Sequence, residues 1–587
     1  MRRKSILVTY LLAGALFLSG CTVSGDSGVL VSADETYETS GEDPEDYRLE
    51  DNKSLYDDDE DGVITMYLTV GKGNEDDGTD HTWTEVNSYP LEYYEKNGIN
   101  PYRCEAVLQI GDEEGPVNGE FGYSDRTANA TVQLRGTGAS SWQQKSYRIK
   151  IKDGSGDWRD QKTISLNKHV TDPVRFKNKL AYSLMEDIPQ MMAARTQFVH
   201  LYVKDKTEGE DGLFEDYGLY TQVEQVNKAY LRNRGFDSDG ALYQTTSAFD
   251  WQRHEDSILA STDADYDKDK FEQYLEVDGS EEHDSMVELL DAVNDESIPI
   301  SDIVARYFDS DNLYYWMAFH ILTGNADVLD GNYYLYNARG QDRWYFISWD
   351  NDGILNEGYE TLRDESYNRS WKKGIFLYSD TVLFQRILKD ASCREDLDQA
   401  VEDLSQNYLT EKKVKDKIDT YKEMTEEYVF RLPDRTYARA TQDDYEALAE
   451  SMAGEVEANY AAYQESMSSA WPFHILTPEN NGGETVLCWQ EAYRFDGGDV
   501  SYTVELARDY SFSQHLVQQT TDKTSISVDT LPAGQYFLRV RAEGADEISR
   551  DAYESYRTEA GTVCYSTLCF YVQNDGSIVA VEYSEDD

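Results

Sequence analysis

The sequence predicts an α+β fold, with a two-lobed domain followed by a small all-β sandwich. Three observations over the 587 residues lead to this prediction. Alternating apolar and polar residues predict short strands between residue 62 and about residue 224. From residue 301 to 467 the spacing is largely helical, with one apolar hairpin at residues 333–349. After Trp471, short apolar runs return with turn residues between them.

The first residues are typical of a bacterial lipoprotein signal. A positively charged start precedes an apolar run over residues 6–18, which is shorter than the roughly 20 residues that span a bilayer. The run ends in Leu18-Ser19-Gly20-Cys21, which resembles a lipobox. We therefore expect residues 1–21 to be a signal peptide. Cys21 would carry a lipid anchor on the extracytoplasmic face of the cell membrane. The alternative is an ordinary secretory signal with a chance cysteine.

Residues 22–61 are rich in Ser, Gly, Asp and Glu, so we expect a disordered acidic linker there. Across the chain, 113 acidic residues outnumber 54 Lys and Arg, which gives a formal net charge of −59. This charge repels phosphate backbones and excludes nucleic acid as a partner. A phosphate-bearing ligand would need local basic residues or a metal ion.

The strand-rich part contains a Gly/Ser loop at residues 135–142 between two predicted strands. Predicted strands cover residues 64–70, 106–110, 130–134, 145–151, 198–203 and 218–224. In the strand after the loop, Tyr147 and Ile149 share one face, and Arg148 and Lys150 share the other. Asp172-Pro173 predicts the start of a helix, because Asp is a common N-cap and Pro suits the first position.

The strongest chemical signal lies around the hairpin. A helix carrying His320, which we expect in the core, ends at Gly324. A loop then presents Asp327 and Asn332, and the hairpin ends in Asp350-Asn351-Asp352. Phosphoryl transfer uses such a set: one Asp for the acceptor hydroxyl, and an Asn with a later Asp for Mg²⁺. The alternative is a polar loop in an Asp-rich chain.

Five ordered blocks resemble the spore-coat CotH kinase family. The blocks are residues 135–150, 172–182, 218–226, 325–336 and 349–352. They fall within residues 62–467, which we take as one domain. The resemblance implies an atypical two-lobed protein-kinase-like fold that binds ATP with Mg²⁺ and phosphorylates Ser or Thr.

The resemblance also implies roles for four residues around the hairpin. Asp327 would be the catalytic Asp, and Asp350 the principal Mg²⁺ ligand. Asn332 would be a supporting metal ligand, and Asp352 a second carboxylate. Asp330 is a rival for the role of base, because no basic residue or His stands beside Asp327.

Further candidates lie in the strand-rich part. Lys145, Arg148 and Lys150 would bind the phosphates of the nucleotide, with a solvated strand face as the alternative. Glu224 would lie near the nucleotide, at the hinge or paired with a Lys, with a solvated strand edge as the alternative. Trp142 would belong either to the core or to the wall of a cleft.

Residues 471–575 are similar to fibronectin type III modules, and residues 576–587 form an acidic tail. Because a lipid-anchored protein differs from a coat protein, coat substrates are not carried over. The first hypothesis is a Mg²⁺- and ATP-dependent kinase that phosphorylates Ser or Thr of surface proteins or of itself. ATP is scarce outside the cell, so the alternative is an inactive scaffold that binds cell-wall glycan or partner proteins. Given the charge, nucleotide should bind poorly without Mg²⁺.

Overall fold

The structure of the protein is a computed structural model. It describes residues 49–56, 62–209, 212–246, 250–356, 358, 373–378, 381–495, 497–543, 549–558 and 560–581. The signal segment, Cys21 and most of the acidic linker lie outside the described residues. Among the residues that are described, no helix is both long enough and apolar enough to cross a membrane.

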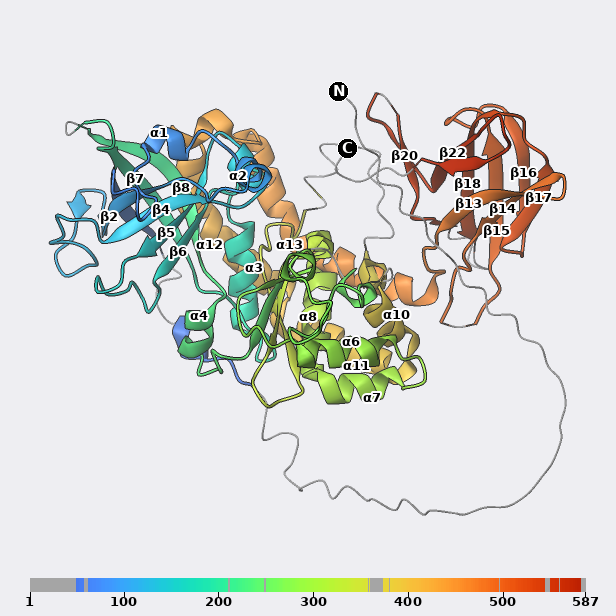
Figure 1. Ribbon diagram of the computed structural model, residues 1–587, viewed down its shortest axis with the longest axis horizontal. Coiled ribbons are helices and arrows are strands. Elements are labelled where there is room, and N and C mark those ends of the chain that lie inside the picture. Colours follow the sequence, from blue (N-terminus) through green and yellow to red (C-terminus); the bar gives the residue numbers. More distant parts are fainter. Residues whose placement is uncertain are drawn as a thin grey trace, which may run out of the picture. The chain divides into compact units, whose positions relative to one another are not determined.

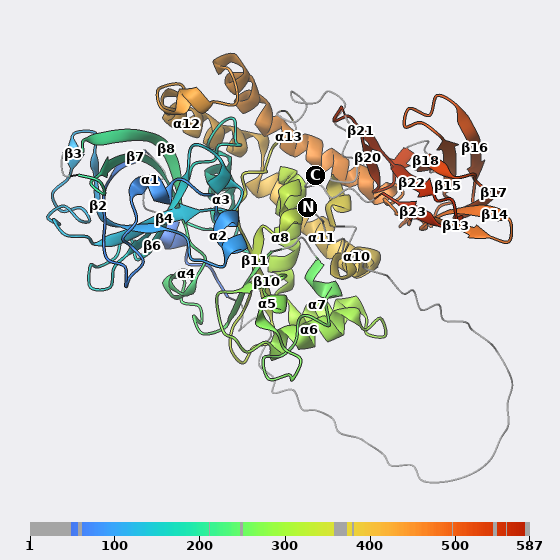
Figure 2. The same ribbon diagram turned by 45° about the horizontal axis from the view of Figure 1, so that its top comes forward.

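The strand-rich part is a barrel (Figures 1 and 2). Its eight strands are β1 (Val63–Gly71), β2 (Arg103–Asp112), β3 (Gly115–Pro116), β4 (Ala130–Arg135), β5 (Ser146–Ile151), β6 (Thr163–Asn167), β7 (Thr196–Asp205) and β8 (Phe214–Glu224). Their order is β1-β7-β8-β6-β5-β4-β2-β3, and β1 also pairs with β2, which closes the sheet on itself. Alternate apolar residues of these strands, such as Leu68, Val132 and Ile149, form one buried core.

Strand β5 confirms the predicted alternation. Tyr147, Ile149 and Ile151 are buried, whereas Arg148 and Lys150 are exposed. The polar side chains therefore lie on the outer face of the barrel.

Helix α3 (Lys177–Glu186) contacts β7 and β8, and it begins four residues later than predicted. Asp172 still satisfies the start of the helix, because its Oδ2 accepts a hydrogen bond from the Lys177 N–H at 3.0 Å. Its Oδ1 accepts one from the Val174 N–H at 3.0 Å. Asp172 thus caps a turn that precedes the helix, and its first helical neighbour is Lys177 rather than Pro173.

The second lobe combines a small sheet with helices. The sheet has the order β10-β9-β11-β12, with β9 (Ala241–Thr245), β10 (Leu275–Val277), β11 (Tyr333–Asn337) and β12 (Trp344–Ser348). The chain also forms α1 (Trp83–Val86), α2 (Leu91–Asn97), α4 (Lys228–Asn233), α5 (Lys268–Phe271), α6 (Asp284–Asn294), α7 (Ile300–Tyr307), α8 (Ser310–Thr323), α10 (Val382–Lys389), α11 (Ala391–Asp403), α12 (Glu411–Val429) and α13 (Gln442–Ser468). The predicted hairpin is β11–β12, in antiparallel register from Tyr333↔Ser348 to Asn337↔Trp344.

Helix α8 ends as its sequence predicts. Gly324 adopts a left-handed conformation, with a φ of 60°, at its C-terminus. The Asn459 Nδ2 of α13 donates a hydrogen bond to the Leu322 carbonyl at 3.1 Å. A Cβ at position 324 would lie 2.8 Å from that Asn459 nitrogen, so the close approach also favours glycine. This end of α8 sets the start of the Asp327 loop.

The expectation of a disordered linker over residues 22–61 is wrong for residues 49–56. Asp51 is buried, and its Oδ1 lies 3.1 Å from the Arg234 Nε. Arg234 in turn pairs with Glu224 at 3.0 Å, and Arg195 pairs with the same carboxylate at 2.7 Å. Lys53 and Tyr56 also bind the Asp51 carboxylate from nearby positions. Arg234 is distant from it in the sequence, so composition alone predicted disorder here.

The C-terminal part is all-β. Its strands are β13 (Ile475–Asn481), β14 (Glu484–Trp489), β15 (Ser501–Ala507), β16 (His515–Thr521), β17 (Ser525–Asp529), β18 (Gly534–Glu543), β19 (Ser549–Asp551), β20 (Ser555–Arg557), β21 (Val563–Tyr565), β22 (Thr567–Val572) and β23 (Ile578–Ala580). A sheet of β13, β14 and β17 and a larger sheet around β15, β18 and β22 share one core, as a sandwich does. Strand β23 falls inside the predicted acidic tail.

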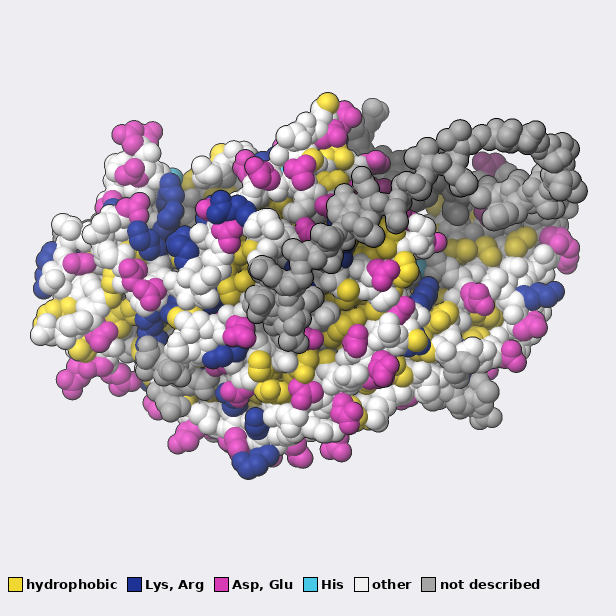
Figure 3. Space-filling view, turned by 90° about the horizontal axis from the view of Figure 1, so that it is seen from below, with side chains coloured by type: hydrophobic (Ala, Val, Ile, Leu, Met, Phe, Trp, Pro, Cys, Tyr) yellow, Lys and Arg dark blue, Asp and Glu magenta, His cyan; other side chains and the backbone are white. Residues whose placement is uncertain are grey.

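Figure 3 shows one face of the molecule, coloured by side-chain type. On this face, Asp and Glu lie scattered, with Lys and Arg among them.

Candidate active site

A cavity of about 460 Å³ lies where the Gly/Ser loop faces the loops that follow α8 and β12. The Gly/Ser loop lines it with residues 135–139 and Trp142, and the segment before α3 lines it with residues 169–172. The second lobe contributes Asp327, Asp350 and Asp352. The cavity therefore brings together the predicted loop and three of the predicted acidic residues.

The Gly/Ser loop is held by hydrogen bonds among its own residues and from Lys145. Gly136 has a φ of 75°, and its carbonyl accepts a hydrogen bond from the Ser140 N–H at 2.8 Å. Lys145 Nζ donates to the Ser140 carbonyl at 2.7 Å. Trp142 is 40% exposed, lines the cavity and lies 4.5 Å from the Arg439 guanidinium. Of the two roles considered for Trp142, the cleft wall is the one that the structure shows.

Arg135 is the cation at the cavity. It is the last residue of β4, and its guanidinium lies over the Trp349 ring at 5.7 Å. Its buried Nε has no hydrogen-bond partner, and within the described part of the chain its guanidinium forms no ion pair. Burial lowers the pKa of Arg135, and the charge of Asp350 opposes this shift. The half-buried guanidinium of Arg135 lines the cavity and can bind an anionic ligand there.

Asp327 is oriented by Asn332. The Asn332 Nδ2 donates to the Asp327 Oδ2 at 2.7 Å and to the Asp327 carbonyl at 3.1 Å. Gly353 packs against the same residue, because a Cβ at position 353 would lie 2.6 Å from the Asp327 Cβ. The structure thus places Asn332 beside Asp327, while the side chain of Asp330 lies outside the described residues.

His320 is a core residue, as expected. It is fully buried, and its Nε2 lies 3.2 Å from the Ser348 Oγ. Its Nδ1 lies 3.1 Å from the Asn325 Nδ2, so it supports the loop that carries Asp327. Burial lowers the pKa of His320 to about 3, and the ring is therefore neutral at physiological pH.

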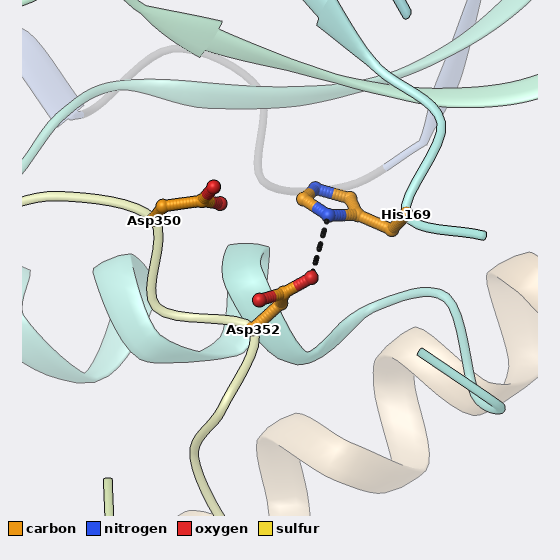
Figure 4. Close-up of side chains that lie close together, drawn as sticks. All are labelled: His169, Asp350 and Asp352. Carbon is orange, nitrogen blue, oxygen red and sulfur yellow. Dashed lines mark hydrogen bonds and ion pairs between the residues drawn. The ribbon is translucent and has the colours of Figure 1, made fainter. Parts of the chain in front are cut away.

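Asp350, Asp352 and His169 form a cluster that fits a divalent cation (Figure 4). One ligand atom from each side chain lies within 4.8 Å of the others. Asp350 and His169 both have a positive φ, 45° and 46°, which is uncommon for residues other than glycine. Such backbone strain is frequent at functional sites. The imidazole nitrogen lies next to the two carboxylates. A divalent cation bound here would neutralise the negative charge of these carboxylates.

The pKa values of the cluster follow from burial and from the charges of its own residues. Desolvation, followed by the nearby Asp352 carboxylate, raises the pKa of Asp350 to about 6. Asp350 faces the cavity and is exposed there, so solvent screens part of this repulsion. Burial lowers the pKa of His169, but the hydrogen bond and charge of Asp352 outweigh it, so that its pKa is raised.

The predicted nucleotide-binding residues do not line this cavity, which corrects their expected position. They are Lys145, Arg148, Lys150 and Glu224. Arg148 and Lys150 lie on the exposed face of β5, as the alternative interpretation held. Lys145 donates a hydrogen bond to the Ser140 carbonyl and so stabilises the Gly/Ser loop. Glu224 is 1% exposed and bound to Arg195 and Arg234, so it lies neither at a solvated edge nor beside a Lys.

Sequence reasoning missed Arg135 and His169, and it assigned no role to Asn178. Arg135 and Asn178 fall inside blocks that carried the resemblance, and Arg135 directly precedes the glycines. His169 had no such signal, because it reaches Asp352 only through the folded chain, 183 positions apart.

Comparison with known proteins gives one family match. The family model described as CotH kinase protein matches residues 132–463, more than half of the chain. A search of curated proteins finds no match.

Two solved structures are similar over about half of the chain. One is the proinflammatory kinase CtkA of Helicobacter pylori, with 9% identity, 54% of this chain and 94% of that chain covered, and a TM-score of 0.27. The other is the toxin–antitoxin system HipA, HipB with operator DNA from Shewanella oneidensis MR-1. It has 12% identity, 52% and 58% coverage, and a TM-score of 0.22.

Proposed function

Since the chain belongs to the CotH kinase family, we propose that it is a phosphotransferase that uses ATP and Mg²⁺ to phosphorylate Ser or Thr hydroxyls. In this reaction the hydroxyl oxygen forms a bond to the γ-phosphorus, and the bond from that phosphorus to the β,γ-bridging oxygen breaks. The hydroxyl proton passes to a carboxylate, and ADP leaves.

One observation carries this proposal: the cavity is lined by a carboxylate suited to accept the proton, a carboxylate pair suited to a cation, and a guanidinium that forms no ion pair within the described part of the chain. Asp327 takes the first role, and Asn332 holds its carboxylate in a fixed orientation. Arg135 takes the third role and would bind phosphate oxygens. The Gly/Ser loop covers this region with backbone that can approach a phosphate closely.

Asp350 and Asp352 would hold the Mg²⁺. When bound, the cation neutralises charge on the phosphates and orients them. The two carboxylates are the hard oxygen donors that Mg²⁺ requires. Because they lie beside the cavity in a strongly acidic protein, nucleotide would bind poorly to the protein without the metal.

Replacing Arg135 by Met should weaken ATP binding. A hydrogen bond to a charged group contributes about 1.5–3 kcal/mol, so we expect the KM for ATP to rise roughly 10- to 100-fold. Arg148→Met, on the exposed face of β5, is the matched control and should change the KM less than about twofold. Steady-state kinetics with varied ATP measure both values. Equal effects of the two substitutions would contradict the assignment of Arg135.

The experiment that tests the proposed function is phosphoryl transfer from labelled ATP. The chain without its signal peptide is incubated with ATP, Mg²⁺ and extracytoplasmic proteins, and label on itself and on these proteins is measured. We expect transfer by the wild type and a loss of at least about 10²-fold in Asp327→Asn, because the proton acceptor is removed. The exposed Asp291→Asn variant of α6 should match the wild type. Label that is equal in the wild type and Asp327→Asn, or absent from both, would contradict the proposal and leave the scaffold alternative.

We also propose that the acceptors are surface proteins or the chain itself, since the start of the sequence resembles a lipoprotein signal that ends at Cys21. Radiolabelled palmitate incorporation in wild type and Cys21→Ala cells would test the anchor. The acceptor side chain follows from phosphoamino-acid analysis of labelled protein.

A further inference from the structure

His169 and Asn178, from the segment around the start of α3, contact the acidic pair, Asp350 and Asp352. The His169 Nδ1 is 3.3 Å from the Asp352 Oδ2 (Figure 4). The Asn178 Nδ2 is 3.3 Å from the His169 Nε2 and 3.3 Å from the Asp350 Oδ1. Both residues are buried, with 8% and 1% of their surface exposed. Asn178 therefore contacts both the imidazole and one carboxylate of the cluster.

The orientation of the Asn178 amide is fixed by the backbone. The Asn351 N–H donates to the Asn178 Oδ1 at 3.1 Å. Because a backbone N–H can only donate, the oxygen of the amide must face Asn351. Its NH₂ group then faces the His169 Nε2 and the Asp350 Oδ1, and it donates to both.

This orientation decides the tautomer of His169. Nε2 receives a donor, so it carries the lone pair, and the ring proton is on Nδ1, where Asp352 accepts it. A second proton on Nε2 would face the amide hydrogens of Asn178.

A histidine ligand must offer a lone pair to the metal. In His169 the lone pair is directed to Asn178, and the other nitrogen carries the proton that binds Asp352. We propose that His169 and Asn178 are positioning residues: His169 orients Asp352, Asn178 orients His169 and Asp350, and the cation is bound through carboxylate oxygen and not through imidazole nitrogen. This inference rests on the proposed function of the same cavity.

A site with oxygen ligands selects for hard cations. Carboxylate oxygens suit hard cations such as Mg²⁺ and Mn²⁺, whereas an added imidazole would favour softer ions such as Zn²⁺. Hydrogen bonds to ligating groups commonly change metal affinity 10- to 100-fold when they are removed. Asn178 is in the first turn of α3, so the position of this helix is linked to the orientation of both carboxylates.

Mn²⁺ alone is the probe for the test, with the chain lacking only its signal peptide. The loss of the free Mn²⁺ signal in electron paramagnetic resonance gives the Kd, and pulsed measurements detect any nitrogen bound directly to the ion. For the wild type we expect Mn²⁺ to bind without directly coordinated nitrogen. This measurement requires no variant, so a folding defect cannot obscure it.

Three variants sharpen the test. His169→Asn keeps an amide N–H near the Nδ1 position and tolerates a positive φ, so its Kd should stay within about threefold of the wild type. His169→Ala and Asn178→Leu should each raise the Kd about 10- to 100-fold. Thermal unfolding without Mn²⁺ shows whether each variant is folded.

Directly bound nitrogen in the wild type, or equal losses in His169→Asn and His169→Ala, would overturn this inference and leave the proposed function standing. A wild type that binds no Mn²⁺, even with ATP, would overturn both.

Discussion

Replacing Asp350 by Asn is expected to lower phosphoryl transfer about 10³-fold while making the metal-free protein more stable. The loss of activity follows because the amide removes one of the two negative charges that would hold the cation, and electrostatic stabilisation of transferring phosphates is a large part of catalysis. The exposed Asp291→Asn variant is again the control for activity.

The gain in stability follows from the raised pKa of Asp350, about 6 in the folded protein against an ordinary 3.8. The folded state holds this proton more tightly than the unfolded state, so ionisation of Asp350 costs stability as the pH rises from 3.8 through 6, and the full cost applies above pH 6. Asn removes this cost. Since solvent in the cavity screens part of the repulsion, we expect an increase in Tm of roughly 1–3 °C at pH 7.5 and almost none near pH 4.

Mg²⁺ is expected to stabilise the wild type and not the Asp350→Asn variant. It should raise the Tm of the wild type but not that of Asp350→Asn, since only the wild type has both carboxylates. The shift in the wild type should shrink as the pH falls below about 6, because protonated Asp350 cannot bind a cation. Thermal unfolding at several pH values measures all of these shifts. An equal Mg²⁺ shift in both proteins would show that the cation binds elsewhere.

Replacing Asp434 by Asn should reduce the free energy of unfolding by about 3–5 kcal/mol, because it leaves a buried charge unpaired. The Lys168 Nζ lies 2.7 Å from the Asp434 Oδ1, and the two side chains are 1% and 4% exposed. Desolvation lowers the pKa of Lys168 to about 8 although Asp434 raises it. Asp434 also accepts hydrogen bonds from the Leu219 N–H and the Gln144 Nε2, each at 2.7 Å.

The double variant Lys168→Met with Asp434→Asn is the matched control. It removes both charges and should recover most of the lost stability, since an apolar side chain needs no partner. The difference between the single variant and the wild type should shrink as the pH rises from 7 to 9, because Lys168 of the folded wild type, with a pKa of about 8, then loses its charge and no longer needs Asp434. Denaturant unfolding measures these free energies. A single variant as stable as the wild type would show that the ion pair contributes little.

The sequence was most informative where local pattern determines structure. Alternation in β5 identified its buried and exposed faces correctly, and the spacing before Gly324 identified α8 and its end. The Asp327 loop, the hairpin and Asp350 follow one another in the sequence, so the sequence predicted that they lie in one lobe. The two strands of the hairpin pair with each other and need no distant segment to do so. Asp327, Asp350 and Asp352 were found in this way, and all three line the cavity.

Where the partner of a residue is distant in sequence, local pattern was insufficient. Arg148 and Lys150 are a different case: they were chosen because they are basic and follow the glycines, although alternation, which is local, already directed them to the outside of the barrel. Glu224 is bound by arginines that composition could not select from among many, one of which also binds Asp51 from the supposed linker. The number of charged residues in a chain does not identify the partner of any one of them.

The sequence by itself determined the two-part α+β organisation, the Gly/Ser loop and the acidic residues beside the hairpin, since periodicity, glycine and short turns act over a few residues. Only the tertiary structure showed that Arg135 is the cation at the cavity, and that His169 and Asn178 contact the acidic pair. Asn178 meets Asp350 across 172 positions. Such contacts depend on how the barrel and the second lobe pack, and packing is a property of the whole core that no short segment encodes.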